Sequence, residues 1–412
     1  MDVRLYWIWL SLAVRAGNPY IGAWMRQWKH PRALYEADSE ALLRGGLPPE
    51  AAAKLSDKSL DKAQDVLRET ESRGFWVLTP DDALYPSVLL QLPDFPPVLY
   101  GAGDWRGWED VPAVAVVGSR HISEAGWRRT ATMTAGLSAG GMAIVSGGAV
   151  GGDTAAIEAA LAVGGTCVSV QACGLDVNYP AENEALRARL LQNGGVLLSE
   201  YPLGVKPGRG TFQVRNRLIA GLALGTLVTE AQSRSGTLIT AHCARDQGRD
   251  VFAVPGDEVL CGGCHRLIRE GALLVTSSAD ILAEYLPLYA ATLDIEAACA
   301  AEQDMRRRWQ SEPSDLPPEP PAPKRRRASK KAPVEPASPP APVVPAERPP
   351  MPDGLSPAAQ RVYGALDAQP KLPDELAAET GLTPAQVLGA LTELEITGCA
   401  QNFAGRQYAW KG

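Results

Sequence analysis

Between residues 111 and 285 the sequence alternates short apolar runs with stretches of helical periodicity. Each run is bounded by Gly, Ser or Pro. Continuous apolar runs of this length, separated by helices, indicate parallel strands that are buried on both faces. The sequence therefore predicts an α/β fold with an extended, doubly wound parallel sheet of Rossmann type. The runs are residues 114–117, 142–145, 166–170, 196–198, 226–229, 251–254 and 273–275.

Small and polar residues follow three of the expected strands. Gly118, Ser119 and Arg120 come after the first, Ser146 and Gly147 after the second, and residues 230–236 after the run at 226–229. In sheets of this kind, ligands bind beyond the carboxyl ends of the strands. We therefore expect these segments to line one crevice, with Arg215 and Arg217 on the segment just before it.

The segment FQVRNRLIAGLA, which begins at Phe212, carries an aromatic ring, Asn216 and two arginines, and EAQSRSGTLITA follows at residue 230. Guanidinium groups bind phosphates, a ring lets a base stack, and free N–H groups at a helix start attract anions. The cluster therefore suits single-stranded nucleic acid, and it indicates binding rather than bond-making. Alternatively, the arginines are ordinary surface residues of a helix and Phe212 belongs to the core. Asn216 either orients a base edge or caps its helix.

Together with the segment at Phe212, six further motifs occur in the order seen in the DprA/Smf family, the DNA-processing proteins of bacterial transformation, and the resemblance is dense over roughly residues 75–285. The chain departs from the family pattern at Val150, where a basic residue is usual, and at Gln213, where Pro is frequent. The motifs are VVGSR at 116, IVSGGAVGGD at 144, GLDVNYPAEN at 174, LSEYP at 198, GRDVFAVPG at 248 and LIREGA at 267.

The resemblance implies a protein that protects incoming single strands, loads the RecA recombinase onto them, contacts single-strand-binding protein and forms a homodimer through the Rossmann-type domain. In this interpretation Arg120 clamps a phosphate, and Phe212 offers a stacking surface. The other expected contacts are phosphate contacts by Arg215 and Arg217, a basic approach loop with Lys206 and Arg209, and backbone or hydroxyl donors from Ser146, Gly147, Gly236 and Thr237. Gly118 and Ser119, next to Arg120, are also expected in the DNA-binding site.

The length of 412 residues predicts several domains. We expect a helical domain over 1–72, similar to sterile-alpha-motif or helix-hairpin-helix modules, the Rossmann-type domain over 75–290, and a linker over 310–352. This linker holds close to half of the 34 prolines and the basic run from Lys324 to Lys331, which is either a solvated charge run or a phosphate contact.

Seven scattered cysteines and the absence of a transmembrane segment predict a cytoplasmic protein. A net charge of −7 means that any DNA contact must come from a local patch.

Residues 353–412 have the order of a winged helix. Helices are expected over 358–366, over 372–380 and from an N-cap at Thr383 to Leu394, followed by a hairpin over 399–410 that turns at Gly405. The third helix contains no Lys or Arg, so it is poorly suited to bind DNA in the major groove. We expect it to contact protein or to be vestigial.

Enzyme alternatives are weak in this sequence. The loop from Ser233 to Thr240 resembles that of lysine-decarboxylase-like nucleotide phosphoribohydrolases, but Thr240 stands where they place the catalytic Glu. CGGCH at residue 261 matches a haem-attachment pattern, but it has no export signal and no second cysteine pair for zinc. The chain also shows no nucleophile motif and no two-metal carboxylate cluster. We expect no catalytic residue, metal or cofactor.

Overall fold

The structure, a computed structural model, describes residues 2–311 apart from 107, and residues 351–410 apart from 352–354, 368–370, 398 and 404–406. The chain forms two compact units that divide between residues 322 and 323. The basic run from Lys324 to Lys331 lies outside the described residues, as do Gly405 and the rest of the predicted linker between residues 312 and 350. No described helix combines the length and the apolar character needed to cross a membrane.

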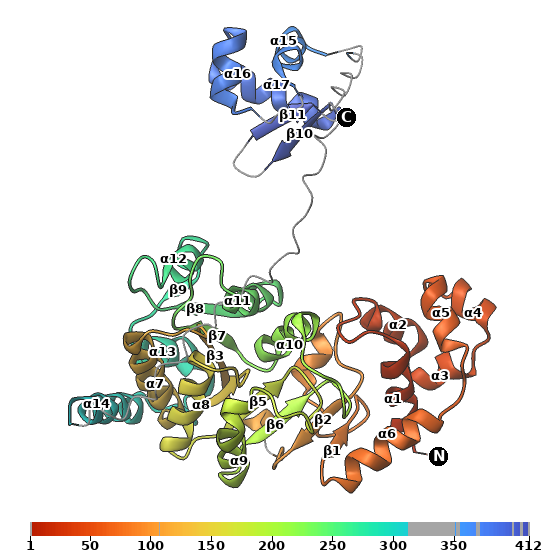
Figure 1. The fold of residues 1–412 in the computed structure, drawn as a ribbon, viewed down its shortest axis with the longest axis vertical. Helices are drawn as coiled ribbons and strands as arrows, with labels where there is room; N and C mark the ends of the chain where they lie inside the picture. Colours follow the sequence, from red (N-terminus) through yellow and green to blue (C-terminus); the bar gives the residue numbers. More distant parts are fainter. Residues whose placement is uncertain are drawn as a thin grey trace, which may run out of the picture. The chain divides into compact units, whose positions relative to one another are not determined.

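The larger unit is built on a sheet of nine strands in the order β1-β2-β6-β5-β4-β3-β7-β8-β9 (Figure 1). The seven strands from β3 to β9 pair in parallel, which confirms the predicted doubly wound sheet. They are Ala113–Val117 (β3), Ala143–Ser146 (β4), Cys167–Gln171 (β5), Val196–Ser199 (β6), Gly225–Val228 (β7), Asp250–Ala253 (β8) and Leu273–Leu274 (β9).

Two further strands lie in the segment that the sequence indicates only as extended. β1 (Trp76–Leu78) and β2 (Leu99–Ala102) pair with each other in antiparallel fashion, and β2 joins the edge of the parallel sheet at β6. The Trp76 ring covers Gly101, where any side chain would meet the indole at 2.1 Å. Two short 3-10 turns, Ser87–Gln91 (η1) and Trp108–Asp110 (η2), flank β2.

Helices cover both faces of the sheet, because alternate strand residues point to opposite sides. Val114 and Val116 belong to one buried cluster, whereas Ala115 and Val117 belong to another. The first face is covered by α7 (Glu124–Ala139), α8 (Gly152–Ala162), α9 (Glu184–Gln192), which follows the turn η3 (Ala181–Asn183), and α13 (Ser278–Tyr289). The second face is covered by α10 (Arg209–Gly221), α11 (Thr237–Asp246), α12 (Gly262–Arg269) and N-terminal helices.

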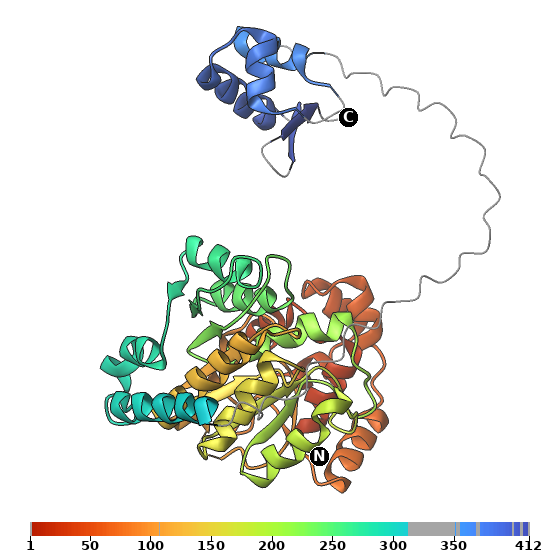
Figure 2. The same cartoon turned by 60° about the vertical axis from the view of Figure 1, so that its left-hand side comes forward.

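Six N-terminal helices pack at the β1 end of the sheet (Figure 2). Their buried residues, among them Ile8, Leu10 and Leu34, share one apolar cluster with the sheet. The apolar stretch at residues 5–10 is therefore part of a buried helix. The helices are Arg4–Ala13 (α1), Ile21–Trp28 (α2), Pro31–Glu36 (α3), Ser39–Arg44 (α4), Pro49–Leu55 (α5) and Asp61–Ser72 (α6).

The Rossmann-type domain continues beyond residue 290, where the sequence places its end. Helix α14 (Ile295–Ser311) runs back along α7 after Asp294 donates its backbone N–H to the Gly140 carbonyl at 3.1 Å. The Glu302 side chain is buried and accepts a hydrogen bond from the Ser278 N–H at 2.6 Å, at the start of α13. Apolar side chains such as Met305 complete the contact with α7.

The described residues of the smaller unit form three helices and a two-stranded sheet around a core of their own. Thr383 caps the third helix, as predicted, and its side chain also forms a capping box with that of Gln386. The helix and hairpin predictions for this region are confirmed to within one or two residues. The elements are Pro357–Ala365 (α15), Pro373–Thr380 (α16), Pro384–Ile396 (α17), Ala400–Phe403 (β10) and Gln407–Trp410 (β11).

A chain that ends at residue 290 should melt roughly 5 to 10 °C below one that ends at Ser311. Removing α14 exposes the side of α7 that Met305 covers and leaves the Ser278 N–H without Glu302. Burial of one such apolar side chain is worth about 1.5–3 kcal/mol, and each kcal/mol shifts the melting temperature of a unit of this size by about 2–4 °C. Circular dichroism of both chains measures the difference, and equal melting temperatures would show that α14 adds no stability.

Candidate nucleic-acid interface

A cleft of about 680 Å³ opens at the carboxyl ends of β3 and β7, between the starts of α10 and α11. Nine of the residues that the sequence singles out line it, so the structure brings most of the predicted site together. They are Gly118, Ser119, Arg120, Arg209, Phe212, Arg215, Asn216, Gly236 and Thr237. Thr240, which replaces the hydrolase glutamate, also lines the cleft.

The Phe212 ring lies between cationic and aromatic side chains. The Arg120 guanidinium carbon is 4.8 Å from the ring centroid, and that of Arg215 is 5.9 Å away. The Tyr179 ring packs on Phe212 with centroids 5.6 Å apart. Phe212 is only half-buried, and Arg120 is exposed, so both remain accessible from the cleft. The alternative assignment of Phe212 to the core is not what the structure shows.

Arg215 forms the wall of the cleft rather than a free cation. The residue is 4% exposed, and its guanidinium donates to the carbonyl oxygens of Gly147, at 2.6 Å, and of Val170. Burial lowers the pKa of Arg215 to about 10, and the nearby Asp153 opposes that shift. The side chain therefore stays protonated at neutral pH. Its positive charge contributes to the cleft, and its hydrogen bonds fix the backbone at Gly147 and Val170.

Arg217 does not reach the cleft, so the predicted phosphate contact at this residue is wrong. Its guanidinium lies 2.6 Å from Glu200 and 3.0 Å from Asp94, and the side chain is 7% exposed. Burial lowers the pKa of Arg217, but the two carboxylates more than offset this, so the pKa is raised. The cause is helical geometry: residues two apart in α10 are about 200° apart around its axis, so Arg215 and Arg217 cannot face the same side.

Ser146 is also excluded as a donor to a ligand. It is fully buried, and its hydroxyl donates to the Val116 carbonyl at 2.8 Å across the sheet. Gly147, the next residue, lines a small cavity that adjoins the cleft beside Phe212. A side chain at Gly147 would meet Arg215 and Asp153 within 2.8 Å, so this position requires glycine.

The loop before α11 is held by its own hydrogen bonds. The Thr237 hydroxyl donates to the Gly118 carbonyl at 3.0 Å, and the Thr237 N–H donates to the Ser235 hydroxyl at 3.2 Å. The Ser119 N–H likewise donates to the Glu230 carbonyl at 2.9 Å. The hydroxyl and N–H of Thr237 and the N–H of Ser119 are thus used within the protein. Gly236, in contrast, is exposed with open space above it.

The basic approach loop is only partly at the cleft. Arg209, the first residue of α10, lines the cleft and is exposed. Lys206 is exposed but is not among the lining residues. The Thr211 hydroxyl accepts the Gly208 N–H at 2.9 Å and so fixes the start of α10 beside Arg209.

The sequence did not single out five polar residues that line the cleft: His121, Asp153, Gln232, Arg234 and Ser235. Arg234 and Gln232 belong to the loop around Gly236. The sequence places this loop at the crevice, but it does not show which side chains of the loop line the cleft. Asp153 is buried, and burial raises its pKa against the opposing effect of Arg215. With four arginines and one carboxylate, the cleft is cationic although the whole chain has a net charge of −7.

Glu230, the carboxylate nearest in sequence to the hydrolase-like loop, faces away from the cleft. It is 2% exposed and accepts the Ser123 N–H at 2.9 Å and the Ser123 hydroxyl at 2.5 Å at the start of α7. Its side chain therefore acts as a structural anchor. Among the described residues, no three His, Cys, Asp or Glu side chains gather as a metal site would require.

These features define a Rossmann-type α/β protein with a cationic cleft at the carboxyl edge of its sheet, followed by a separate small helical unit with a β-hairpin. Residues 76–286 match the family described as DNA recombination-mediator protein A, and residues 345–406 match the DprA winged helix domain. The chain belongs to the DprA/Smf family of DNA-processing proteins, as its motifs indicate.

Relatives at the sequence level include Protein Smf of Synechocystis, which is 34% identical over 83% of this chain and 82% of its own length. The DNA processing protein DprA of Streptococcus pneumoniae is 46% identical over 50% of this chain and 72% of its own. The X-ray structure of the Streptococcus pneumoniae protein superposes on this structure with a TM-score of 0.59 at 34% identity. The alignment covers 69% of this chain and 98% of the Streptococcus pneumoniae chain.

Replacing Arg217 by Met should cost about 3–5 kcal/mol of stability, because Glu200 would remain buried without its cation. The same change at the exposed Arg120 should alter stability by no more than about 0.5 kcal/mol. Differential scanning calorimetry of the larger unit's transition compares the two variants. A small effect at Arg217 would mean that the carboxylates find water or another donor.

Proposed function

We propose that the cleft binds single-stranded DNA through phosphate contacts and base stacking, without a chemical step. The observation that carries this proposal is the exposed Arg120 above the half-buried Phe212 ring, in a cleft with four arginines. Guanidinium groups neutralise phosphates, and an accessible ring can stack on any base, so such a site tolerates every sequence.

The residues have different roles in this proposal. Arg120, Arg209 and Arg234 contact phosphates, with Lys206 at the approach to the cleft. Arg215 supplies positive charge from the wall while it holds Gly147. Asn216 lines the cleft next to Phe212, where its amide can meet a base edge, and the exposed backbone at Gly236 can approach a phosphate closely.

The rest of the proposal follows from the family. We infer that the protein protects single strands in the cytoplasm and loads RecA onto strands already covered by single-strand-binding protein. It would do so as a homodimer formed through the Rossmann-type domain. The edge strand β9 supports that assignment, because Leu273 and Leu274 are exposed by 41% and 54%, and an open strand edge can pair with another.

The winged-helix unit is not proposed as a reader of DNA. Two polar side chains of α17 are engaged within the unit: Glu393 accepts the Ser356 N–H and hydroxyl at 2.7 and 2.6 Å, and the Thr392 hydroxyl donates to the Leu388 carbonyl. Because α17 contains no Lys or Arg, we propose that this unit contacts a protein partner rather than DNA.

We predict that Arg120→Ala weakens binding to all single-stranded sequences alike. Phosphate contacts carry affinity but little sequence information, so the slope of log affinity against log salt should fall by about 0.7. Fluorescence anisotropy with labelled oligonucleotides measures both quantities. Arg68→Ala is the matched control, because Arg68 is an exposed arginine on α6, away from the cleft. Equal affinities for the wild type and both variants would exclude the cleft as the binding site.

The complete function is tested by strand exchange with RecA on DNA coated by single-strand-binding protein. The wild-type protein should accelerate exchange, and Arg120→Ala should reduce the acceleration. The same preparation should release no base from nucleoside monophosphates. The Glu230 carboxylate is hydrogen-bonded to Ser123, so the hydrolase-like loop has no carboxylate that could act as a general base. Base release that Glu230→Gln abolishes would support the nucleotide phosphoribohydrolase instead.

A further inference from the structure

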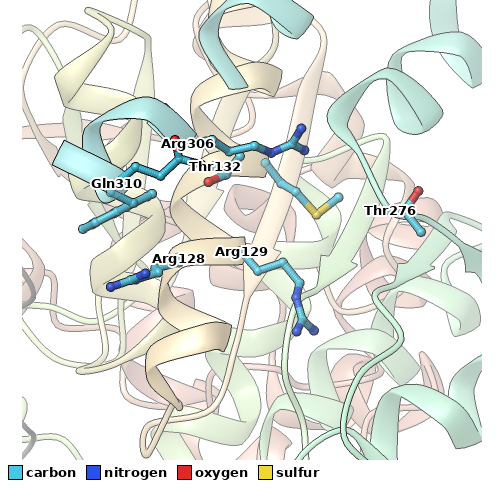
Figure 3. Close-up of a pocket in the computed structure, with 8 residues that line it drawn as sticks. Arg128, Arg129, Thr132, Thr276, Arg306 and Gln310 are labelled. Atoms are coloured by element: carbon cyan, nitrogen blue, oxygen red, sulfur yellow. The ribbon is translucent and has the colours of Figure 1, made fainter. Parts of the chain in front are cut away.

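A second cavity, of about 330 Å³, lies between α7 and α14. Arg128 and Arg129 come from α7, Arg306 comes from α14, and Thr276 borders the opening from the segment before α13 (Figure 3). Trp309 forms part of the wall, and the remaining lining residues are Thr132, Met133 and Gln310. We call this cavity the α7–α14 pocket.

Three arginines line the α7–α14 pocket, and no carboxylate does so in the part of the chain that the structure describes. Two of the arginines have acidic partners on their own helices, Arg128 with Glu124 at 2.6 Å and Arg306 with Glu302 at 2.7 Å. The third, Arg129, instead donates to the Pro255 carbonyl at 3.0 Å. The pocket therefore keeps a positive charge that those two carboxylates do not cancel.

Two buried donors beside the pocket lack an acceptor. The Arg128 guanidinium carbon lies 5.7 Å from the Trp309 ring, and neither the Arg128 Nε nor the Trp309 Nε1 has a hydrogen-bond partner among the described residues. A buried donor without a partner is destabilising, and a ligand oxygen in the pocket would remove that penalty. The indole also offers a surface of the kind on which a base stacks.

The α7–α14 pocket is close to the cleft along the chain. Ser119, Arg120 and His121 line the cleft, and α7 begins at Glu124. Arg128 is four residues into this helix, about 6 Å along its axis. A strand that leaves the cleft past His121 would therefore reach the first turns of α7.

We propose that the α7–α14 pocket binds a further nucleotide of the same single strand, with its phosphates at the arginines and its base at Trp309. This inference rests on the proposed binding of single-stranded DNA in the cleft. The guanidinium groups of Arg128, Arg129 and Arg306 point to different sides of the opening (Figure 3), which suits successive phosphates better than one small anion. Helix α14 lies outside both segments that match the family, so the pocket includes a part of the chain to which neither match extends.

The test compares Arg306→Gln with Arg307→Gln. Both arginines lie on α14 and pair with an acid of the same helix, but Arg307 does not line the pocket. The acid beside Arg306 is the buried Glu302, whereas Asp304 beside Arg307 is exposed, so the melting temperature of each variant is measured with its affinity. Affinity is measured by anisotropy for oligothymidylates of increasing length. We expect Arg306→Gln to weaken the long oligonucleotides several-fold, with a fall of about 0.7 in salt slope, and to leave the short ones unchanged. Arg307→Gln should alter neither.

A second variant, Gln310→Glu, places a negative charge in the pocket without removing an ion pair, and it should show the same length dependence. Melting curves confirm that the variants are folded. Unchanged affinity at every length for both pocket variants would overturn the proposal while the cleft remains supported by Arg120→Ala. Binding of free dAMP that Arg306→Gln weakens, with no length effect on oligonucleotides, would overturn it in favour of a mononucleotide site. Failure of the wild type to bind any oligonucleotide would reject both proposals.

Discussion

The arrangement of the cleft depends on two arginines of α10, Arg215 and Arg217, which are fixed on opposite sides of the helix. Arg217 is held by Glu200 and Asp94, which come from the end of β6 and from the segment before β2. Arg215 is held by the carbonyl groups of Gly147 and Val170, which follow β4 and end β5. Each guanidinium thus ties α10 to separate parts of the sheet. Because both arginines are locked, the outer residues of the same helix, Arg209 and Phe212, have a rigid base from which to contact a ligand.

An acidic protein can offer a binding site for an anion when its charges are distributed unevenly. Four arginines line the cleft, and Asp153 is the one carboxylate among its described lining residues. Arg215, in the wall of the cleft, is close enough to oppose the rise in the pKa of Asp153. Several of the other arginines of the larger unit are paired one turn away on their own helices, as Arg32 is with Glu36 and Arg44 with Glu40. Such exposed pairs contribute little to stability, but they cancel charge locally. The net charge of −7 therefore says little about the carboxyl edge of the sheet.

The sequence predicted the sheet and the place of the cleft well, because both follow from local patterns. Short apolar runs define parallel strands, and the carboxyl ends of such strands share one edge, which brought Gly118, Arg120 and Gly236 together. The direction of single side chains was less accessible. The burial of Ser146 depends on the last residue of β4 still lying within the sheet, and that of Arg217 depends on acids that are distant in the chain. The role of α14 was also missed as part of the domain, since its amphipathic pattern does not reveal that α7 is its partner.

Glu230 connects the two regions that we assign to DNA. Its carbonyl holds the Ser119 N–H at the floor of the cleft, and its carboxylate caps α7 through Ser123. Gly126 is kept small by this contact, because a side chain there would meet the Glu230 carboxylate at 2.2 Å. The carboxylate that a hydrolase would need as a base is thereby used to orient the helix that carries Arg128 and Arg129. A change in the direction of that helix would move the α7–α14 pocket relative to the cleft, so the same residue that argues against catalysis sets the spacing between the two proposed contacts with the strand.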